Sequence, residues 1–560
     1  MSTSLFPPLR FKLLWAGLWQ PRNVWTLAVW VVAALVALPV LVVLGSIFAD
    51  ATAIWQHLVE TVLVQYVRNS LALMVGVGIG VCLLGVSTAW LVAACEFPGR
   101  RQFEWALLLP LAAPAYLLAY TYTDWLDYFG PVQSNLRLLF GWERATDYWF
   151  PDVRSLGGAI LMLSLTLYPY VYILARVAFL EQSRCTLEAS RSLGCGPWRS
   201  FFTVALPLAR PAVMAGLALA LMETLNDFGT VEYFGVPTFT TGIYRTWFGM
   251  GEQVAAAQLS AMLMLFILAL LLLERWSRRQ ARYYQVGNDT QAATAYILDW
   301  RQALMAQWVC GLPILLGLLL PGGLLLQMTL KNLDETLDSR FFELAYRSFL
   351  LATLTAGIAI AISLILAYGV RLNRSQPIRI GVRLAAMGYG IPGAVIAVGI
   401  LIPVIRLDRS IIAFMEGSFG ISPGLVLTGT ATALVFAYLV RFLAVSLGAI
   451  EAGLTKIQPS LDEAARSLGN SPTQTLLKIH VPLMGSSLLT AVMLVFVDVM
   501  KELPATLVMR PFNFDTLAVQ VYQYASDERL VEASAPALMI LLVGLLPVIF
   551  LSRQIARNRP

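Results

Sequence analysis

Carboxylates inside otherwise apolar stretches are the first residues in this sequence that could do chemistry. They lie in LALALMETLNDFG and VMLVFVDVMKELP, and they are Glu223, Asp227, Asp498 and Glu502. An ionisable side chain is costly inside an apolar helix, so its presence suggests a function. Residues four apart share one face of a helix, and carboxylate oxygens suit hard metal ions. The four carboxylates, with the neighbouring Lys501, therefore predict the outer part of a cation route. The alternative is that they end helices and pair with Lys501 or arginines.

The two carboxylate pairs occupy equivalent positions of an internal repeat. Residues 188–210 and 463–485 are identical at nine of 23 aligned positions, with a constant offset of 275. The same offset aligns Thr241 with Thr516, and an offset of 278 continues the alignment upstream. A repeat of this length indicates two similar halves. Two parallel halves about an axis along the membrane normal typically line a transport path. The alternative is a duplicated membrane protein without a transport role.

Long apolar runs must position these residues. The chain of 560 residues is 58% apolar and only 13% charged, and a bilayer core needs about 20 apolar residues in a helix. The sequence predicts an all-α polytopic membrane protein of about 12 spans, six in each half. The candidate runs are Trp25–Phe48, Leu71–Ala94, Trp105–Tyr122, Leu156–Phe179, Ala212–Met222, Ala255–Leu273, Trp308–Gln327, Phe349–Val370, Leu384–Ile405, Gly424–Val440, Ser487–Val497 and Ala533–Leu551.

The distribution of positive charge predicts the orientation. Most of the 39 Lys and Arg residues fall in segments that share one side if the first run is a retained helix. The positive-inside rule then places both termini in the cytoplasm. We expect a first half at residues 1–285, a cytoplasmic linker at 286–303 and a second half at 304–560. The loops that carry the repeated element are residues 183–210 and 458–485.

Two further patterns limit the chemistry. The five cysteines are odd in number and lack partners at zinc-site spacing, so we expect neither a disulfide framework nor a zinc site. The sequence has no Gly-x-x-x-x-Gly-Lys-Ser/Thr phosphate loop, so we expect ATP to be bound by another protein. The chain is thus expected to bind no cofactor of its own and not to be an enzyme. The sequence assigns no metal ligands.

The repeated element encodes a short helix and a forced turn on the predicted cytoplasmic side. In the second copy, Ser460 and Glu463 have the spacing of a capping box. Gly469 then supplies a left-handed stop, and Pro472 prevents continuation of the helix. The first copy has the same Glu-to-Gly spacing, ending at Gly194. One such element could be an ordinary surface helix, whereas two matched copies indicate a rigid docking site for a partner protein.

These loops resemble the signature loop of binding-protein-dependent ATP-binding-cassette importers. Glu-Ala-Ala, a glycine six residues after the Glu, and a Leu-Pro-like pair make up the pattern; Ser190 and Val481 depart from it. The resemblance implies that each loop is a coupling helix, with two ATPase subunits carrying ATP and Mg²⁺, a periplasmic or lipid-tethered binding protein, and alternating access in a bacterial inner membrane. The implied coupling residues are Glu188, Ala189, Arg191, Gly194, Pro207, Glu463, Ala464, Arg466, Gly469 and Pro482.

Two longer stretches resemble the permeases of ferric-iron importers. They are FPGRRQFEWALLLPLAAPAYLLAYTYTDWLDYFGPVQ and VDVMKELPATLVMRPFNFDTLAVQVYQYASDERL. The resemblance implies ferric iron as the substrate. Alternatives are thiamine, a polyamine or an oxyanion carried by a related importer, or an ion-coupled secondary transporter, against which the paired loops argue. Tyrosines in the first stretch could contact iron, but anchoring at the membrane interface is the preferred interpretation; they are Tyr116, Tyr120, Tyr122 and Tyr128.

Overall fold

The computed structural model describes residues 21–182, 194, 196–279, 296–373, 375–422 and 424–557. In this part of the chain, nine helices are long and apolar enough to cross a membrane, and three bent helix pairs raise the number to 12. All 12 overlap the runs predicted from the sequence. The prediction of an all-α polytopic protein is confirmed.

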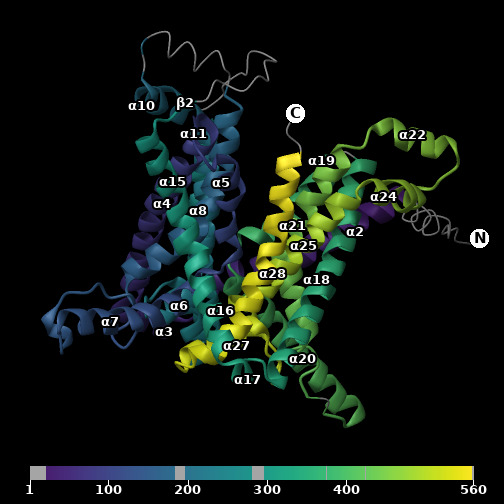
Figure 1. Cartoon of the computed structure of the whole chain (residues 1–560). Helices are drawn as coiled ribbons and strands as arrows, with labels where there is room; N and C mark the ends of the chain where they lie inside the picture. Colours follow the sequence, from purple (N-terminus) through teal and green to yellow (C-terminus); the bar gives the residue numbers. More distant parts are fainter. Residues whose placement is uncertain are drawn as a thin grey trace, which may run out of the picture. The chain divides into compact units, whose positions relative to one another are not determined.

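The elements of the first half run from the N-terminal span to the helix that precedes the linker (Figure 1). They are α2 (Pro21–Gly45), η1 (Ser46–Phe48), α3 (Thr52–Thr61), α4 (Leu63–Ala94), β1 (Cys95–Glu96), α5 (Arg100–Ala106), η2 (Leu109–Ala112), α6 (Ala115–Leu126), α7 (Pro131–Phe140), η3 (Ala145–Asp147), α8 (Leu156–Leu180), α10 (Pro197–Ser200), η4 (Phe201–Ala205), α11 (Leu206–Asn226), α12 (Gly229–Tyr233), α13 (Phe239–Tyr244), η5 (Arg245–Gly249) and α14 (Gln253–Arg279).

The second half repeats this order with different lengths. Its elements are β2 (Tyr296–Ile297), α15 (Trp300–Ile314), η6 (Leu315–Leu319), α16 (Leu320–Lys331), α17 (Leu333–Thr336), α18 (Ser339–Leu372), α19 (Gln376–Ala385), η7 (Met387–Gly390), α20 (Gly393–Phe419), α21 (Ala431–Thr455), α22 (Pro459–Ser467), α23 (Pro472–Thr475), η8 (Leu476–His480), α24 (Val481–Leu483), α25 (Gly485–Met500), α26 (Pro504–Met509), α27 (Leu517–Ser526) and α28 (Leu530–Arg557). The strands β1 and β2 form one short parallel pair.

Three of the predicted spans are bent where the sequence interrupts the helix. The bends are 88° between η2 and α6, 115° between η7 and α20, and 82° between α24 and α25. Pro114 and Pro392 directly precede α6 and α20, and a proline cannot continue the hydrogen bonding of a preceding helix. The predicted run Gly424–Val440 is helical only from Ala431. Gly424 and Gly429 have positive φ angles of 70° and 71°, which end helical continuity there.

Contacts between Cα atoms divide the chain into two compact units that do not follow the sequence halves. One unit comprises residues 1–45, 349–499 and 509–512, and the other comprises residues 46–348, 500–508 and 513–560. In the first of these units α2 packs against α19 and α20. In the other unit, the counterpart of α2, which is α15 with η6 and α16, packs against η2 and α6. The first span of each half therefore packs with spans of the other half.

Small residues allow the helices within each unit to lie close together. In one unit α4 runs beside α8 (Figure 1), and a Cβ atom added to Gly85 of α4 would lie 2.7 Å from Val171 Cβ of α8. In the other unit a Cβ atom added to Gly399 of α20 would lie 2.5 Å from the carbonyl oxygen of Pro39 in α2. Close backbone approach at small residues is the usual way in which membrane helices associate.

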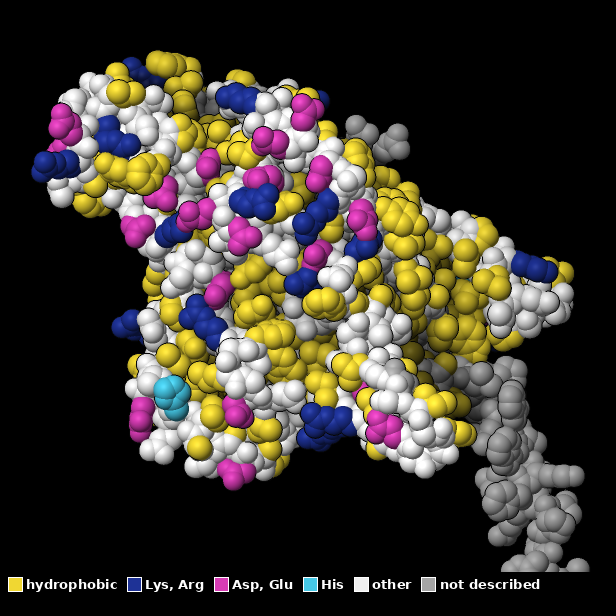
Figure 2. All heavy atoms as spheres, turned by 90° about the horizontal axis from the view of Figure 1, so that it is seen from below, with side chains coloured by type: hydrophobic (Ala, Val, Ile, Leu, Met, Phe, Trp, Pro, Cys, Tyr) yellow, Lys and Arg dark blue, Asp and Glu magenta, His cyan; other side chains and the backbone are white. Residues whose placement is uncertain are grey.

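Large apolar side chains remain exposed along the spans. Examples are Val64 and Leu83 of α4, which are 73% and 67% exposed. A lipid environment accounts for this exposure, because apolar side chains that face hydrocarbon tails lose nothing by it. On the face shown in Figure 2, acidic and basic side chains are interspersed among extensive hydrophobic areas.

Candidate functional site: the coupling loops and the segments after α11 and α25

The second coupling loop begins with α22, which starts two residues earlier than the capping box requires. Its N-cap is Gln458, and no side chain caps the helix there. The predicted capping box of Ser460 and Glu463 is therefore wrong. Pro459 explains the difference, because proline favours the first position of a helix and fixes φ there.

The predicted glycine stop is confirmed in the second loop, whereas the stop in the first loop stays a prediction because the residues before Gly194 lie outside the described part of the chain. Gly469 follows α22 with φ +78°, and Gly194 has φ +79°. The next helix, α23, begins at Pro472 and has its own capping box: Ser471 Oγ accepts from the Gln474 amide at 3.3 Å, and Gln474 Oε1 accepts from the Ser471 amide at 2.9 Å. The turn between α22 and α23 is thus fixed by a left-handed glycine and a reciprocal cap.

One face of α22 is exposed and partly apolar. Glu463, Ala464 and Arg466 are exposed, while Leu461 and Leu468 are 41% and 80% exposed. Leu461, Ala464 and Leu468 are spaced as residues on one helix face. The exposed surface of α22 therefore offers apolar contact on one side and charges of both signs, from Glu463 and Arg466, on another.

The opposite face of α22 is held by an ionic cluster formed by Arg371, Asp462 and His480. Arg371 Nε donates to Asp462 Oδ2 at 2.8 Å, and its two terminal nitrogens donate to the carbonyl oxygens of Leu454 at 2.8 Å and Ile457 at 3.0 Å. His480 Nε2 lies 2.9 Å from Asp462 Oδ1, and the His480 side chain is fully buried. Arg371 therefore joins the end of α18 to the end of α21 and to the first turn of α22. Sequence reasoning missed this cluster.

The first coupling loop is described only in part. Glu188, Ala189 and Arg191 lie outside the described residues. Downstream, the chain is one continuous helical span from Trp198 to Asn226, and Pro207 lies in the first turn of α11. Pro482 lies in α24.

The carboxylates that follow these spans do not share a helix face as predicted. The helix α11 ends at Asn226, and α25 ends at Met500, so the chain has left the helix before Asp227 and Glu502. The four-residue spacing therefore does not place either pair on one helical face. This prediction from the sequence is wrong, because periodicity alone does not show where a helix stops.

Asp227 and Glu502 instead take the same local role in the two halves. Asp227 Oδ1 accepts from the amides of Thr230 and Val231, both at 3.1 Å, at the start of α12. Glu502 accepts from the amides of Ala505 at 2.9 Å and Thr506 at 3.0 Å at the start of α26. Each carboxylate also accepts a hydroxyl hydrogen bond, from Thr230 at 3.0 Å and Thr506 at 2.6 Å. These two residues thus lie at helix ends, as the alternative stated above expects, while its pairing with Lys501 or arginines stays a prediction.

The remaining predicted pathway residues are partly exposed. They are Glu223, Asp498 and Lys501. Among the described residues, no group of three or more His, Cys, Asp or Glu side chains is placed to hold a metal ion. Three cysteines of the described part are free, Cys82, Cys95 and Cys310.

Three of the four tyrosines lie inside the protein rather than at a membrane interface. Tyr116 and Tyr120 of α6 are only 5% and 3% exposed, so interface anchoring is wrong for them. Tyr122 is also buried, and its hydroxyl donates to the Leu316 carbonyl oxygen at 2.7 Å. Tyr128 is partly exposed, and the Arg137 guanidinium lies 4.1 Å from its ring centroid.

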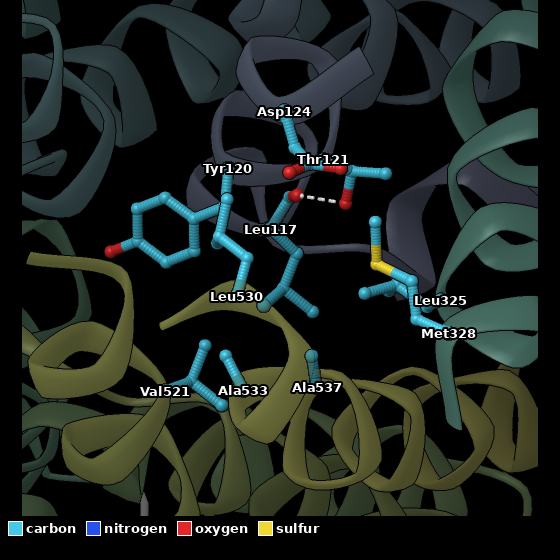
Figure 3. Close-up of a pocket in the computed structure, with 10 residues that line it drawn as sticks. All are labelled: Leu117, Tyr120, Thr121, Asp124, Leu325, Met328, Val521, Leu530, Ala533 and Ala537. Carbon is cyan, nitrogen blue, oxygen red and sulfur yellow. Dashed lines mark hydrogen bonds between the residues drawn. The ribbon is translucent and has the colours of Figure 1, made fainter. Parts of the chain in front are cut away.

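A small pocket lies beside α6 and is mostly apolar. Its lining is formed by Leu117, Tyr120, Thr121, Asp124, Leu325, Met328, Val521, Leu530, Ala533 and Ala537. Figure 3 shows that the Tyr120 hydroxyl points away from the other lining side chains. It also shows that the Thr121 hydroxyl donates a hydrogen bond to the Leu117 carbonyl oxygen. The polar end of Tyr120 is therefore not part of this pocket.

The comparisons with known proteins agree with the repeat and the spans. A model of the family described as "Binding-protein-dependent transport system inner membrane component" matches residues 13–283 and 357–559. The chain is 26% identical over 493 residues to the Fe(3+)-transport system permease protein FbpB 2 of Haemophilus influenzae, covering 87% of this chain and 90% of the relative. It is 24% identical to the putative ferric transport system permease protein FbpB 1 of the same organism, covering 86% of this chain and 77% of the relative.

A shorter relative is named for the transport of a different substrate, molybdenum. The molybdenum transport system permease protein ModB of Escherichia coli is 31% identical over 207 residues, which is 35% of this chain and 86% of ModB. The family model matches both halves of the chain and together covers well over half of it. The chain therefore belongs to the family of binding-protein-dependent transport system inner membrane components.

Proposed function

We propose that this chain is the membrane-spanning subunit of an ATP-driven importer of ferric iron. The observation that carries the proposal is its similarity to the two ferric permeases of Haemophilus influenzae along 87% and 86% of its length. In addition, Asp227 and Glu502 place negative charge at equivalent points of both halves, which suits a cation better than an anion.

The energy for transport would come from two ATPase subunits that bind ATP and Mg²⁺. One subunit would contact the exposed face of α22 around Leu461, Ala464 and Leu468, and a second would contact residues 183–210. The cluster of Arg371, Asp462 and His480 supports this role for α22, because a helix that is held firmly on one side can pass movements of the ATPase subunit on to the spans. These movements would drive alternating access of the transport path.

An iron-binding protein outside the membrane would deliver the substrate. The excess of Lys and Arg in the loops on one side supports a cytoplasmic location for that side and for both termini. The charged face of α22 would then lie in the cytoplasm, where ATP is available. Labelling of engineered cysteines in intact cells tests this orientation: Asp147→Cys should react with an impermeant reagent, and Arg466→Cys should not. Reaction at position 466 would contradict the orientation.

Molybdate import is the second candidate. The identity of 31% to ModB supports it, although that similarity covers only 35% of this chain. Thiamine and polyamines are the other alternative substrates, and the uptake experiment below compares them with ferric iron.

Uptake by the complete complex tests the proposal. Membrane vesicles would contain this permease and its ATPase, with the binding protein added outside and ATP inside. We expect uptake of radioactive ferric iron that depends on ATP and on the binding protein. Uptake of molybdate, thiamine or a polyamine without uptake of iron would contradict the ferric assignment while leaving an importer. Iron uptake driven by an ion gradient without ATP would contradict the ATPase coupling.

A further inference from the structure

The hydroxyl groups of Tyr116 and Tyr120 belong to two neighbouring buried rings. Both rings belong to α6, with ring centroids 5.7 Å apart, and both are at least nine-tenths buried. Within the described part of the chain, neither hydroxyl oxygen has a hydrogen-bond partner. A buried hydroxyl without a partner costs about 1–3 kcal/mol. A cost of this kind is a reason to look for a ligand.

The surroundings of the two phenols come from both sequence halves within one compact unit. Tyr116 lies within electrostatic range of Asp227 and Glu502, and Tyr120 lies within range of Asp227. The packing here is tight: a Cβ atom added to Gly229, at the start of α12, would lie 2.8 Å from Tyr116 Cβ and 2.9 Å from Leu503 Cδ2. The segments capped by Asp227 and Glu502 therefore meet at the Tyr116 side chain.

More aromatic side chains complete this environment. The Tyr233 ring of α12 lies edge-on to Tyr120, with centroids 4.5 Å apart, and Tyr522 of α27 is also within electrostatic range of Tyr120. The Arg154 guanidinium lies 5.1 Å from the Tyr233 ring centroid. Its charge is partly balanced by Asp127 at 4.0 Å and Glu528 at 3.8 Å.

We propose that the phenol oxygens of Tyr116 and Tyr120 form a transient ferric-iron site on the transport route, with Asp227 and Glu502 supplying balancing negative charge. The proposal rests on the proposed function, since it names the groups that meet the ferric substrate. Oxygen donors suit hard cations, and tyrosine phenolate is an established ligand of iron in proteins. Each phenol releases its proton to water as its oxygen binds the ion.

The charges near the phenols decide between a cation and an oxyanion. Two hydroxyl groups alone could donate hydrogen bonds to molybdate as well as bind iron. Two carboxylates close to Tyr116 disfavour an anion, because like charges in a buried setting repel strongly. Both phenols are buried in this structure, so the site would bind iron only in a state of the transport cycle that exposes it.

The test uses the complete transport complex and a matched control. Tyr116→Phe with Tyr120→Phe keeps both rings and removes only the two oxygens. The control is Tyr168→Phe, because Tyr168 is fully buried in α8 and its hydroxyl also has no partner in the described part of the chain. Ferric uptake should fall on the order of tenfold or more in the double variant, the scale of losing metal-site groups. Tyr168→Phe should transport as the wild type does.

A spectroscopic measurement gives a second readout. The purified complex loaded with ferric citrate while cycling ATP should show a visible ferric–phenolate absorption band, and the double variant should lack it. If the wild type takes up iron and the double variant shows the same uptake or the same band, the site is overturned and the ferric function stands. If the wild type takes up molybdate and no iron, both the site and the ferric function are overturned. Intact ATP hydrolysis in the double variant would show that the complex still assembles.

Discussion

The two halves use different interactions to anchor equivalent helix ends beside the coupling loops. In the second half, Arg371, Asp462 and His480 form an ionic cluster beside the Tyr368 ring. Their counterparts in the first half, by the repeat offsets, are Ala93, Leu187, Ala205 and Trp90. Trp90 packs there against the rings of Phe179, Phe201 and Tyr296, with centroids 5.3, 5.0 and 6.4 Å away. Charge in one half corresponds to aromatic packing in the other.

This difference shows that the repeat preserves the elements and not the interactions between them. An ionic cluster is directional, because Arg371 reaches a carboxylate and two carbonyl oxygens in fixed positions. An aromatic cluster fixes distance more than direction. The second coupling helix is therefore expected to be the more rigidly linked to its spans. A single substitution in each cluster can test this expectation.

Removal of the Arg371 guanidinium should have the largest effect. Arg371→Ala takes the guanidinium from Asp462 and one hydrogen-bond donor from each of the Leu454 and Ile457 carbonyl oxygens. Breaking a largely buried ion pair costs about 3–5 kcal/mol. We expect a lower unfolding temperature and loss of transport with residual ATP hydrolysis. Arg371→Lys is the control and should recover part of transport, because lysine keeps the charge but not the fork of donors. Normal transport by Arg371→Ala would remove the cluster from the coupling mechanism.

Truncation of Trp90 should come next. Trp90 is 6% exposed, and loss of a buried aromatic side chain costs about 3–5 kcal/mol. We expect Trp90→Ala to lower the unfolding temperature while the ratio of transported substrate to hydrolysed ATP stays close to that of the wild type. Trp90→Phe, which keeps an aromatic ring, should lose less stability. A strongly reduced ratio of transported substrate to hydrolysed ATP in Trp90→Ala would show that the aromatic cluster also couples ATP hydrolysis to transport.

Sequence reasoning located the repeat, the 12 apolar runs and the glycine stops, because each depends on residues close together in the chain. It missed the ionic cluster, since Arg371 lies 91 residues from Asp462 and reads as one more positive charge at a helix end. One signal was present: the repeat replaces three polar residues by Ala93, Leu187 and Ala205. It also misjudged Tyr116, Tyr120 and Tyr122, because aromatic composition does not distinguish an interface from the interior of a bundle.

The two glycine stops provide a place where the halves should behave alike. Gly194 and Gly469 both have positive φ, and a Cβ atom at either position would meet nothing within 4 Å. Alanine there costs only the left-handed backbone strain, about 1–2 kcal/mol. Gly194→Ala and Gly469→Ala should therefore reduce transport to a similar degree. Gly485→Ala is the control, because its site is also open but has no positive φ. A strong effect at one stop alone would mean that the halves differ in coupling as well as in anchoring.

The smallest effect on stability is expected from the paired helix caps, Asp227 and Glu502. Asp227→Asn and Glu502→Gln keep the size of each side chain and weaken the hydrogen bonds that start α12 and α26. Loss of a cap costs about 0.5–2 kcal/mol. The loss should be larger at Glu502, which is 4% exposed, because a buried amide without its acceptor is not compensated by water. Thermal unfolding of the purified complex measures both, with Glu223→Gln as the control at a partly exposed position. Ferric uptake should fall in both variants, because the proposed ferric site uses the negative charge of both carboxylates. Lost uptake at wild-type stability would mean that they act on the ion and contribute little as caps. That result would support the cation route predicted from the sequence. It would also mean that the two halves are alike in the function of these carboxylates and not only in their local structure.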